Sequence, residues 1–139
     1  MPIELIPLCE ADAKLAEPIV IGNGPQGVRI VVEVEEATLT GDRINGRMKG
    51  RAGADWVTVV GTTGCVDVRM TFETDDAALI FVQYQGRLDL TNGAGSAPVY
   101  VAPTFETSAP QYSWLNLVQA VGKGAIDGHH LHYEWFEVR

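Results

Sequence analysis

The sequence predicts an all-β fold: a single antiparallel closed β-barrel of about eight strands. Three observations predict it. The 139 residues fit one domain, short runs rich in β-branched and aromatic residues alternate with turn residues, and no segment keeps helical spacing over three turns. We favour a barrel over a sandwich because closure removes the exposed edges that such apolar strands would leave.

The first half of the chain is expected to begin with a short N-terminal strand. Residues 28–40 are rich in β-branched side chains and stop at the turn Gly41-Asp42, which predicts a strand. Residues 44–48 and 55–60 read as two short antiparallel strands. The connection between them, residues 49–53, contains two glycines, which suit a hairpin.

The best strand spans residues 65–73, where apolar and polar side chains alternate strictly. One face carries Val66, Val68, Met70 and Phe72, and the other carries Asp67, Arg69, Thr71 and Glu73. A turn at residues 74–76 leads into the apolar and aromatic run 77–85, so these two strands should form a hairpin.

The second half adds a glycine-rich segment and three more strands. The segment between Asp89 and Ala97 is either a mobile lid or a plain surface loop, and its composition favours the loop. Residues 98–105, 114–121 and 131–138 are each expected to form a strand. The total of about eight strands includes the short N-terminal one.

Charge and composition exclude several classes of partner. Eighteen acidic and ten basic residues give a net charge of -8, which opposes binding to nucleic acid. The N-terminus has no basic region, and no apolar run approaches the ~20 residues that a membrane helix needs. Cys9 and Cys65 allow at most one disulfide, so we expect a cytoplasmic protein without a signal peptide or membrane segment.

Two acidic positions stand out as candidate site residues. Asp67 and Arg69 project to the same side of their strand, where they form either a clamp inside the barrel or an ordinary surface ion pair. Alternation alone favours the surface. Asp55 precedes Trp56, a combination that raises a carboxyl pKa if both are sheltered, but a turn-capping aspartate beside a core tryptophan is the simpler interpretation.

The segment 104–116 gathers large hydrogen-bonding side chains, namely Glu106, Tyr112, Trp114 and Asn116. Such residues furnish the walls and polar groups of a ligand pocket. A packed loop that crosses one end of a barrel has the same composition.

Three histidines, His129, His130 and His132, raise the question of a metal. His130 and His132 would share a strand face, and Asp127 or Glu134 could assist, but a third ligand is missing nearby. A surface strand explains the segment more simply, and we expect no metal. The two cysteines lie in no CxxC motif, so a zinc or nucleophile role has no support.

Read together, several blocks resemble the family of unknown function DUF3237, also labelled UPF0311. They are the GDRING stretch at 41–46, GADW at 53–56, DVR at 67–69, and FET at 105–107 followed by YSWLN at 112–116. The resemblance runs from about residue 28 to residue 138. It implies a small closed barrel of the lipocalin-like or allene-oxide-cyclase-like kind, and cofactor-independent lyase, decarboxylase or isomerase chemistry on small, often aromatic, metabolites.

The resemblance also moves Arg69 into the lumen. In the hypothesis that we favour, an enzyme with a pocket at the barrel mouth, Arg69 holds a carboxylate or an oxyanion, while Asp55 or Glu106 moves the proton. The remaining candidates are the donors Tyr84 and Tyr112, the walls Trp56 and Trp114, and the ligand-binding residues Asp67 and Asn116. No cofactor is expected.

Two other classes of function stay open. One is a non-catalytic barrel that carries an apolar metabolite with the same aromatic side chains. The other is a homo-oligomer, because the strand at 77–84 is apolar enough on both faces to bury one against a second copy.

Overall fold

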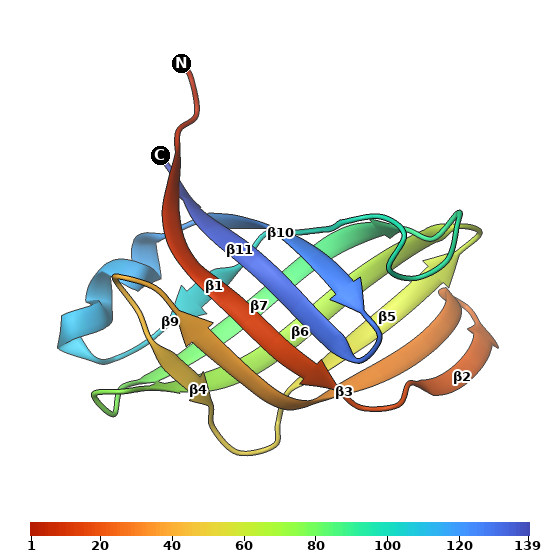
Figure 1. Ribbon diagram of the computed structural model, residues 1–139, viewed down its shortest axis with the longest axis horizontal. Coiled ribbons are helices and arrows are strands. Elements are labelled where there is room, and N and C mark those ends of the chain that lie inside the picture. Colours follow the sequence, from red (N-terminus) through yellow and green to blue (C-terminus); the bar gives the residue numbers. More distant parts are fainter.

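The computed structural model describes all 139 residues, and strands make up most of them (Figure 1). The elements in chain order are β1 (Leu5–Leu15), β2 (Ile19–Gly24), β3 (Gly27–Thr40), β4 (Gly46–Met48), β5 (Ala54–Val60), β6 (Thr63–Thr74), β7 (Leu79–Asp89), β8 (Val99–Val101), β9 (Thr104–Glu106), the 3-10 helix η1 (Pro110–Leu117), β10 (Ala120–Asp127) and β11 (His130–Val138).

All strand pairs are antiparallel, and the sheet closes on itself. The ring runs β6, β5, β3, β1, β11, β10, β8 and β7, and β7 pairs with β6 again. Shorter strands extend some ring positions: β4 lies like β5 between β3 and β6, β9 follows β8 along β7, and β2 pairs only with β3. The predicted closed antiparallel barrel of about eight strands is confirmed.

Several predicted elements need correction. Residues 114–117 do not form a strand but the last part of η1. This helix begins at Pro110, whose fixed φ suits the first turn of a helix. The run 98–105 is interrupted at Ala102 and Pro103, so it forms β8 and β9. β4 and β5 do not form a hairpin with each other, because each pairs with β3 and β6. β2 was not predicted, and β1 is a long strand of 11 residues.

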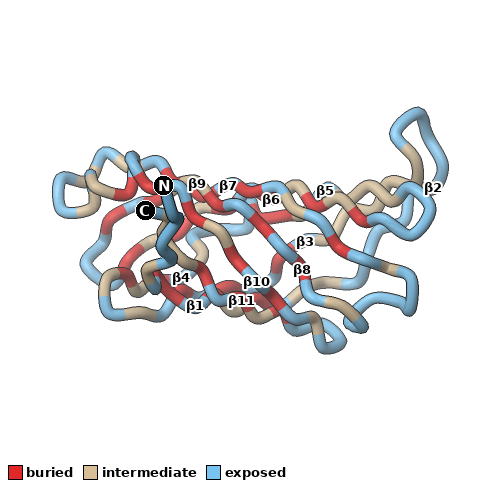
Figure 2. Tube along the Cα trace, turned by 90° about the horizontal axis from the view of Figure 1, so that it is seen from above, coloured by how far each residue is buried: buried red, intermediate tan, exposed pale blue.

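The core lies inside the barrel, and the inward faces of the strands supply it. In β6 the predicted alternation holds, since Val66, Val68, Met70 and Phe72 are all buried. Figure 2 shows buried residues recurring along the strands. The largest fully buried side chain is Trp135, whose indole packs edge-on against Phe105 at a centroid distance of 6.0 Å.

Two glycines of β10 let large rings lie against the barrel wall. A Cβ on Gly122 would fall 2.5 Å from the Trp135 ring, and a Cβ on Gly124 would fall 2.5 Å from the Tyr133 ring. Both distances are too short for a side chain, so the aromatic residues of β11 depend on glycine across the strand pair. No helix in the structure has the length and hydropathy needed to cross a bilayer.

Candidate active site in the barrel lumen

A cavity of about 260 Å³ lies inside the barrel, and core residues such as Val66, Val68 and Tyr84 form part of its lining. Of its 23 lining residues, 19 are hydrophobic, and they come from the inner faces of most barrel strands. The rim includes Pro18, Ala94 and His129, which belong to connections at the end of the barrel opposite η1 (Figure 1). The glycine-rich loop after β7 thus contributes to the cavity mouth through Ala94.

Asp55 is the one carboxyl group that lines this cavity. Its Oδ1 accepts a hydrogen bond of 2.9 Å from the backbone N–H of Asp67. Burial raises the pKa of Asp55 to about 6; the bond from Asp67 opposes that rise, and the charge on Asp67 adds to it. A carboxyl group with such a pKa exchanges its proton near neutral pH, as a general acid or base must.

The position of Asp55 depends on a local break in the sheet. The β5–β6 ladder pairs Asp55 with Val68 and resumes at Thr58 and Cys65, so the two pairs between them are missing. The freed amide of Asp67 binds the Asp55 carboxylate, and the carbonyl of Trp56 accepts a bond of 3.0 Å from Arg29. Two side chains therefore replace the missing backbone partners, which holds the carboxyl group in place.

Two tyrosines complete the polar part of the cavity. Val68 of β6 pairs with Asp55 of β5 on one side and with Tyr84 of β7 on the other. Asp55 and Tyr84 therefore flank the same inward residue. The Tyr84 and Tyr133 rings meet edge to face, with centroids 5.7 Å apart, and both side chains are buried. Burial raises the pKa of Tyr84 and Tyr133 far above the ordinary value, so both hydroxyls stay protonated. The two hydroxyls also interact with each other, which adds to the rise in the pKa of Tyr84 and opposes that of Tyr133, so Tyr84 acts as the donor toward Tyr133 and the Tyr133 proton is left for a ligand.

The sequence interpretation included Tyr84 but missed Tyr133. The signal was present: Leu131, Tyr133 and Trp135 alternate along the last strand, and all three point inward. Trp135 packs against both tyrosines, with its ring centroid 5.7 Å from that of Tyr84 and 6.1 Å from that of Tyr133.

Arg69 does not lie in the lumen, and that expectation is wrong. It alternates with the buried residues Val68 and Met70, so its side chain projects from the outer face, as alternation alone indicated. Asp67 also lies on this face, and Trp56 is 38% exposed there, with its ring 6.0 Å from the Arg69 guanidinium. The hollow beside Arg69 and Asp67 is a polar depression of the outer surface.

The segment with Glu106, Tyr112, Trp114 and Asn116 lies at the closed end, opposite the mouth. The Tyr112 hydroxyl donates to Asp76 at 2.8 Å, and the Trp114 ring lies 4.7 Å from the Arg43 guanidinium. Asn116 exchanges two hydrogen bonds with the backbone of Thr107, at 2.8 and 2.9 Å. Glu106 is exposed. The segment is a packed closure of the barrel end, and none of these four residues lines the cavity.

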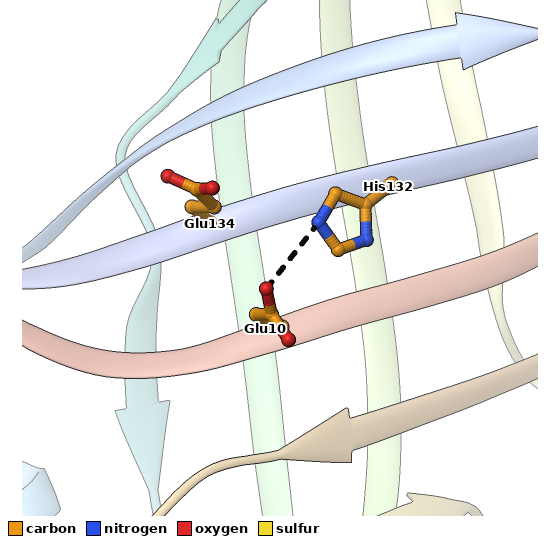
Figure 3. A group of neighbouring side chains, drawn as sticks. All are labelled: Glu10, His132 and Glu134. Carbon is orange, nitrogen blue, oxygen red and sulfur yellow. Dashed lines mark ion pairs between the residues drawn. The ribbon is translucent and has the colours of Figure 1, made fainter.

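Two histidines, His130 and His132, lie with acidic residues on the outer face of β1 and β11. One potential ligand atom each of Glu10, His132 and Glu134 lies within 4.8 Å of the others (Figure 3). Asp12 Oδ1 accepts from His132 at 2.8 Å and contacts His130 at 3.2 Å. The bond to Asp12 raises the pKa of His132.

The third potential ligand, which the sequence did not show nearby, is Glu10 of β1, and only the pairing of β1 with β11 brings it to His132 and Glu134. His129 instead sits at the cavity mouth, with Nδ1 3.1 Å from the Leu15 carbonyl oxygen and Nε2 3.1 Å from Glu17.

Solved structures share this barrel. A beta-barrel like protein (ABAYE2633) of Acinetobacter baumannii AYE is 29% identical, with a TM-score of 0.90 over 100% of this chain and 98% of the other. A protein with unknown function from Clostridium acetobutylicum ATCC 824 has a TM-score of 0.91 at 19% identity, over 99% of this chain and 100% of the other. An enzyme from Penicillium herquei has a TM-score of 0.73 at 22% identity, over 99% of this chain and 96% of the other.

No curated protein matches the chain. One family model does match, and it covers residues 3–138. Because this match spans nearly the whole chain, the chain belongs to the family described as protein of unknown function (DUF3237).

Proposed function

We propose that this protein is a cofactor-independent enzyme that performs general acid/base chemistry on a small, aromatic metabolite held in the barrel lumen. The observation that carries the proposal is Asp55: a half-buried carboxyl group with a pKa of about 6 in an otherwise apolar cavity, beside two tyrosine hydroxyls. A cavity that only stores an apolar molecule has no use for an ionisable group, because burying it costs stability.

The three polar side chains divide into two roles. The ionised Asp55 takes a proton from a carbon next to a carbonyl group, and the protonated form returns it. Tyr133 donates a hydrogen bond to the oxygen that becomes negative when that proton leaves, and Tyr84 donates to Tyr133. The apolar walls exclude water and strengthen these interactions.

Isomerisation and elimination both start from this step. If the proton returns to another carbon, the product is an isomer; if a group leaves from the β carbon, the reaction is that of a lyase. The neighbour from Penicillium herquei, which has a similar fold, is described as an enzyme, and this description supports the catalytic proposal. Arg69, Glu106 and Tyr112 have no part in this proposal because they lie outside the cavity.

The test uses 2-acetonaphthone, a neutral aromatic ketone, in deuterated buffer. NMR would follow the replacement of its methyl protons by deuterium; these protons are acidic because they lie next to the carbonyl group. The wild-type protein should exchange them faster than buffer, with a rate that rises as pH passes about 6, where Asp55 ionises. Asp55→Asn should abolish the acceleration, whereas Asp127→Asn, which removes an exposed carboxylate at the end of β10, should keep it. Equal rates for wild type and Asp55→Asn would refute the proposal.

A carrier function is the second candidate, and the apolar character of 19 of the 23 lining residues favours it. A carrier would bind the ketone and return it with its protons unexchanged. The possible homo-oligomer stays a prediction, which light scattering would test; on the outer face of β7, Leu79 is 53% exposed.

A further inference from the structure

We propose that the lumen selects uncharged ligands that present a carbonyl-type oxygen to Tyr84 and Tyr133, and that it rejects carboxylates. This inference rests on the proposed use of the lumen as the binding site, and it names the class of molecule bound there. It also reverses the expectation that an arginine holds a substrate carboxylate.

The charge of the cavity lining disfavours a carboxylate. No lysine or arginine is among the residues that line the cavity, and Arg69 points to the opposite side of its strand. The one basic side chain in the lining is His129 at the mouth, whose two ring nitrogens already contact the Leu15 carbonyl oxygen and the Glu17 carboxylate. A carboxylate that entered would leave water without gaining a cation, which is strongly unfavourable in an apolar site.

The cavity already holds one carboxyl group, that of Asp55. Asp55 faces the space from β5, and its ionised form repels any other anion there. The Asp67 amide already donates to Asp55, so that donor is not free to bind a ligand carboxylate.

The tyrosine hydroxyls are the hydrogen-bonding groups that remain for a ligand. Tyr84 and Tyr133 come from β7 and β11, and both belong to the cavity lining although their side chains are buried. A phenol hydroxyl is a good donor to a neutral oxygen acceptor. The ligand that fits this set has an aromatic or alicyclic body against the valine and leucine walls and one acceptor oxygen at the tyrosines.

A matched pair of probes tests this inference: 2-acetonaphthone, which is neutral, and 2-naphthoate, its anionic analogue of nearly equal size. Binding to the wild-type protein is measured by equilibrium dialysis at pH 8. The ketone should bind at least roughly tenfold more tightly than the carboxylate. Asp55→Asn should reduce the ratio of ketone affinity to carboxylate affinity because it removes the repelling charge, and Asp127→Asn should leave this ratio unchanged.

The role of the acceptor is tested with Tyr84→Phe and Tyr133→Phe, which keep the ring and remove only the hydroxyl. Each should weaken ketone binding by roughly two- to tenfold, the effect of one lost hydrogen bond. Urea midpoints near that of the wild type would show that the variants fold. If only one variant misfolds, the other still decides the outcome.

The outcomes separate this inference from the proposed function. Carboxylate binding as tight as ketone binding would overturn the charge selection, even if proton exchange proceeds. Unchanged ketone affinity in both folded phenylalanine variants would overturn the acceptor role. Selective ketone binding without proton exchange would support this inference and refute the catalytic proposal instead.

Discussion

Replacing Asp55 by asparagine is expected to stabilise the fold at pH 8. The pKa of this carboxyl group rises from 3.8 to about 6 on folding. At about 1.36 kcal/mol per pH unit, keeping it ionised costs the folded state roughly 3 kcal/mol. Asparagine carries no charge, and its side-chain oxygen can still accept the hydrogen bond from the Asp67 amide.

The direction of the pH dependence follows from the pH at which the folded and the unfolded state each bind the Asp55 proton. The unfolded chain releases it near pH 3.8, and the folded protein keeps it until about pH 6. The folded state holds more protons in between, so this group's contribution to stability falls as pH rises through that window and stays low above it.

Urea unfolding of both proteins at pH 4 and pH 8 measures the effect. The variant should exceed the wild type by up to roughly 3 kcal/mol at pH 8 and by little at pH 4. Asp127→Asn, at an exposed position, should show no such pH-dependent gain. If the difference between Asp55→Asn and wild type is the same at both pH values, the carboxyl group does not have the raised pKa on which the proposed chemistry depends.

Three further predictions follow from the packing and the surface clusters. Gly124→Ala should lower the unfolding free energy by about 1–3 kcal/mol, because its Cβ would lie 2.5 Å from the Tyr133 ring; urea denaturation measures this, and an unchanged midpoint would contradict the fit. Asp12→Asn should lower the pKa of His132, which NMR titration would detect, because the bond from His132 to Asp12 is the main cause of the raised value. Asn116→Ala should destabilise the protein by about 0.5–1.5 kcal/mol for each lost hydrogen bond but leave ketone binding intact, since Asn116 lies at the closed end.

The barrel could be predicted from the sequence because strand alternation is local. The inward set of β6 follows directly from positions 66, 68, 70 and 72. The end closure could not, since residues 114–117 have strand-like side chains and only their packing across the barrel end, after Pro110, makes them helical.

The site was only partly predictable. Asp55 and Tyr84 were named, but their proximity depends on the β5–β6–β7 register, and Tyr133 reaches them only because the barrel closes. Arg69 was misplaced where the family resemblance overrode the alternation that correctly put it outside. Pairing across distant strands is the information that one sequence does not display.

The hydrogen bond from the Asp67 amide to Asp55 gives the protein an internal reporter. This amide belongs to the sheet, yet its partner is the lumenal carboxyl group rather than a backbone carbonyl. Its NMR chemical shift should therefore follow the ionisation of Asp55, and its hydrogen exchange should slow when a ligand fills the lumen. One backbone resonance would show the protonation and occupancy of the cavity without any chromophore, label or knowledge of the substrate.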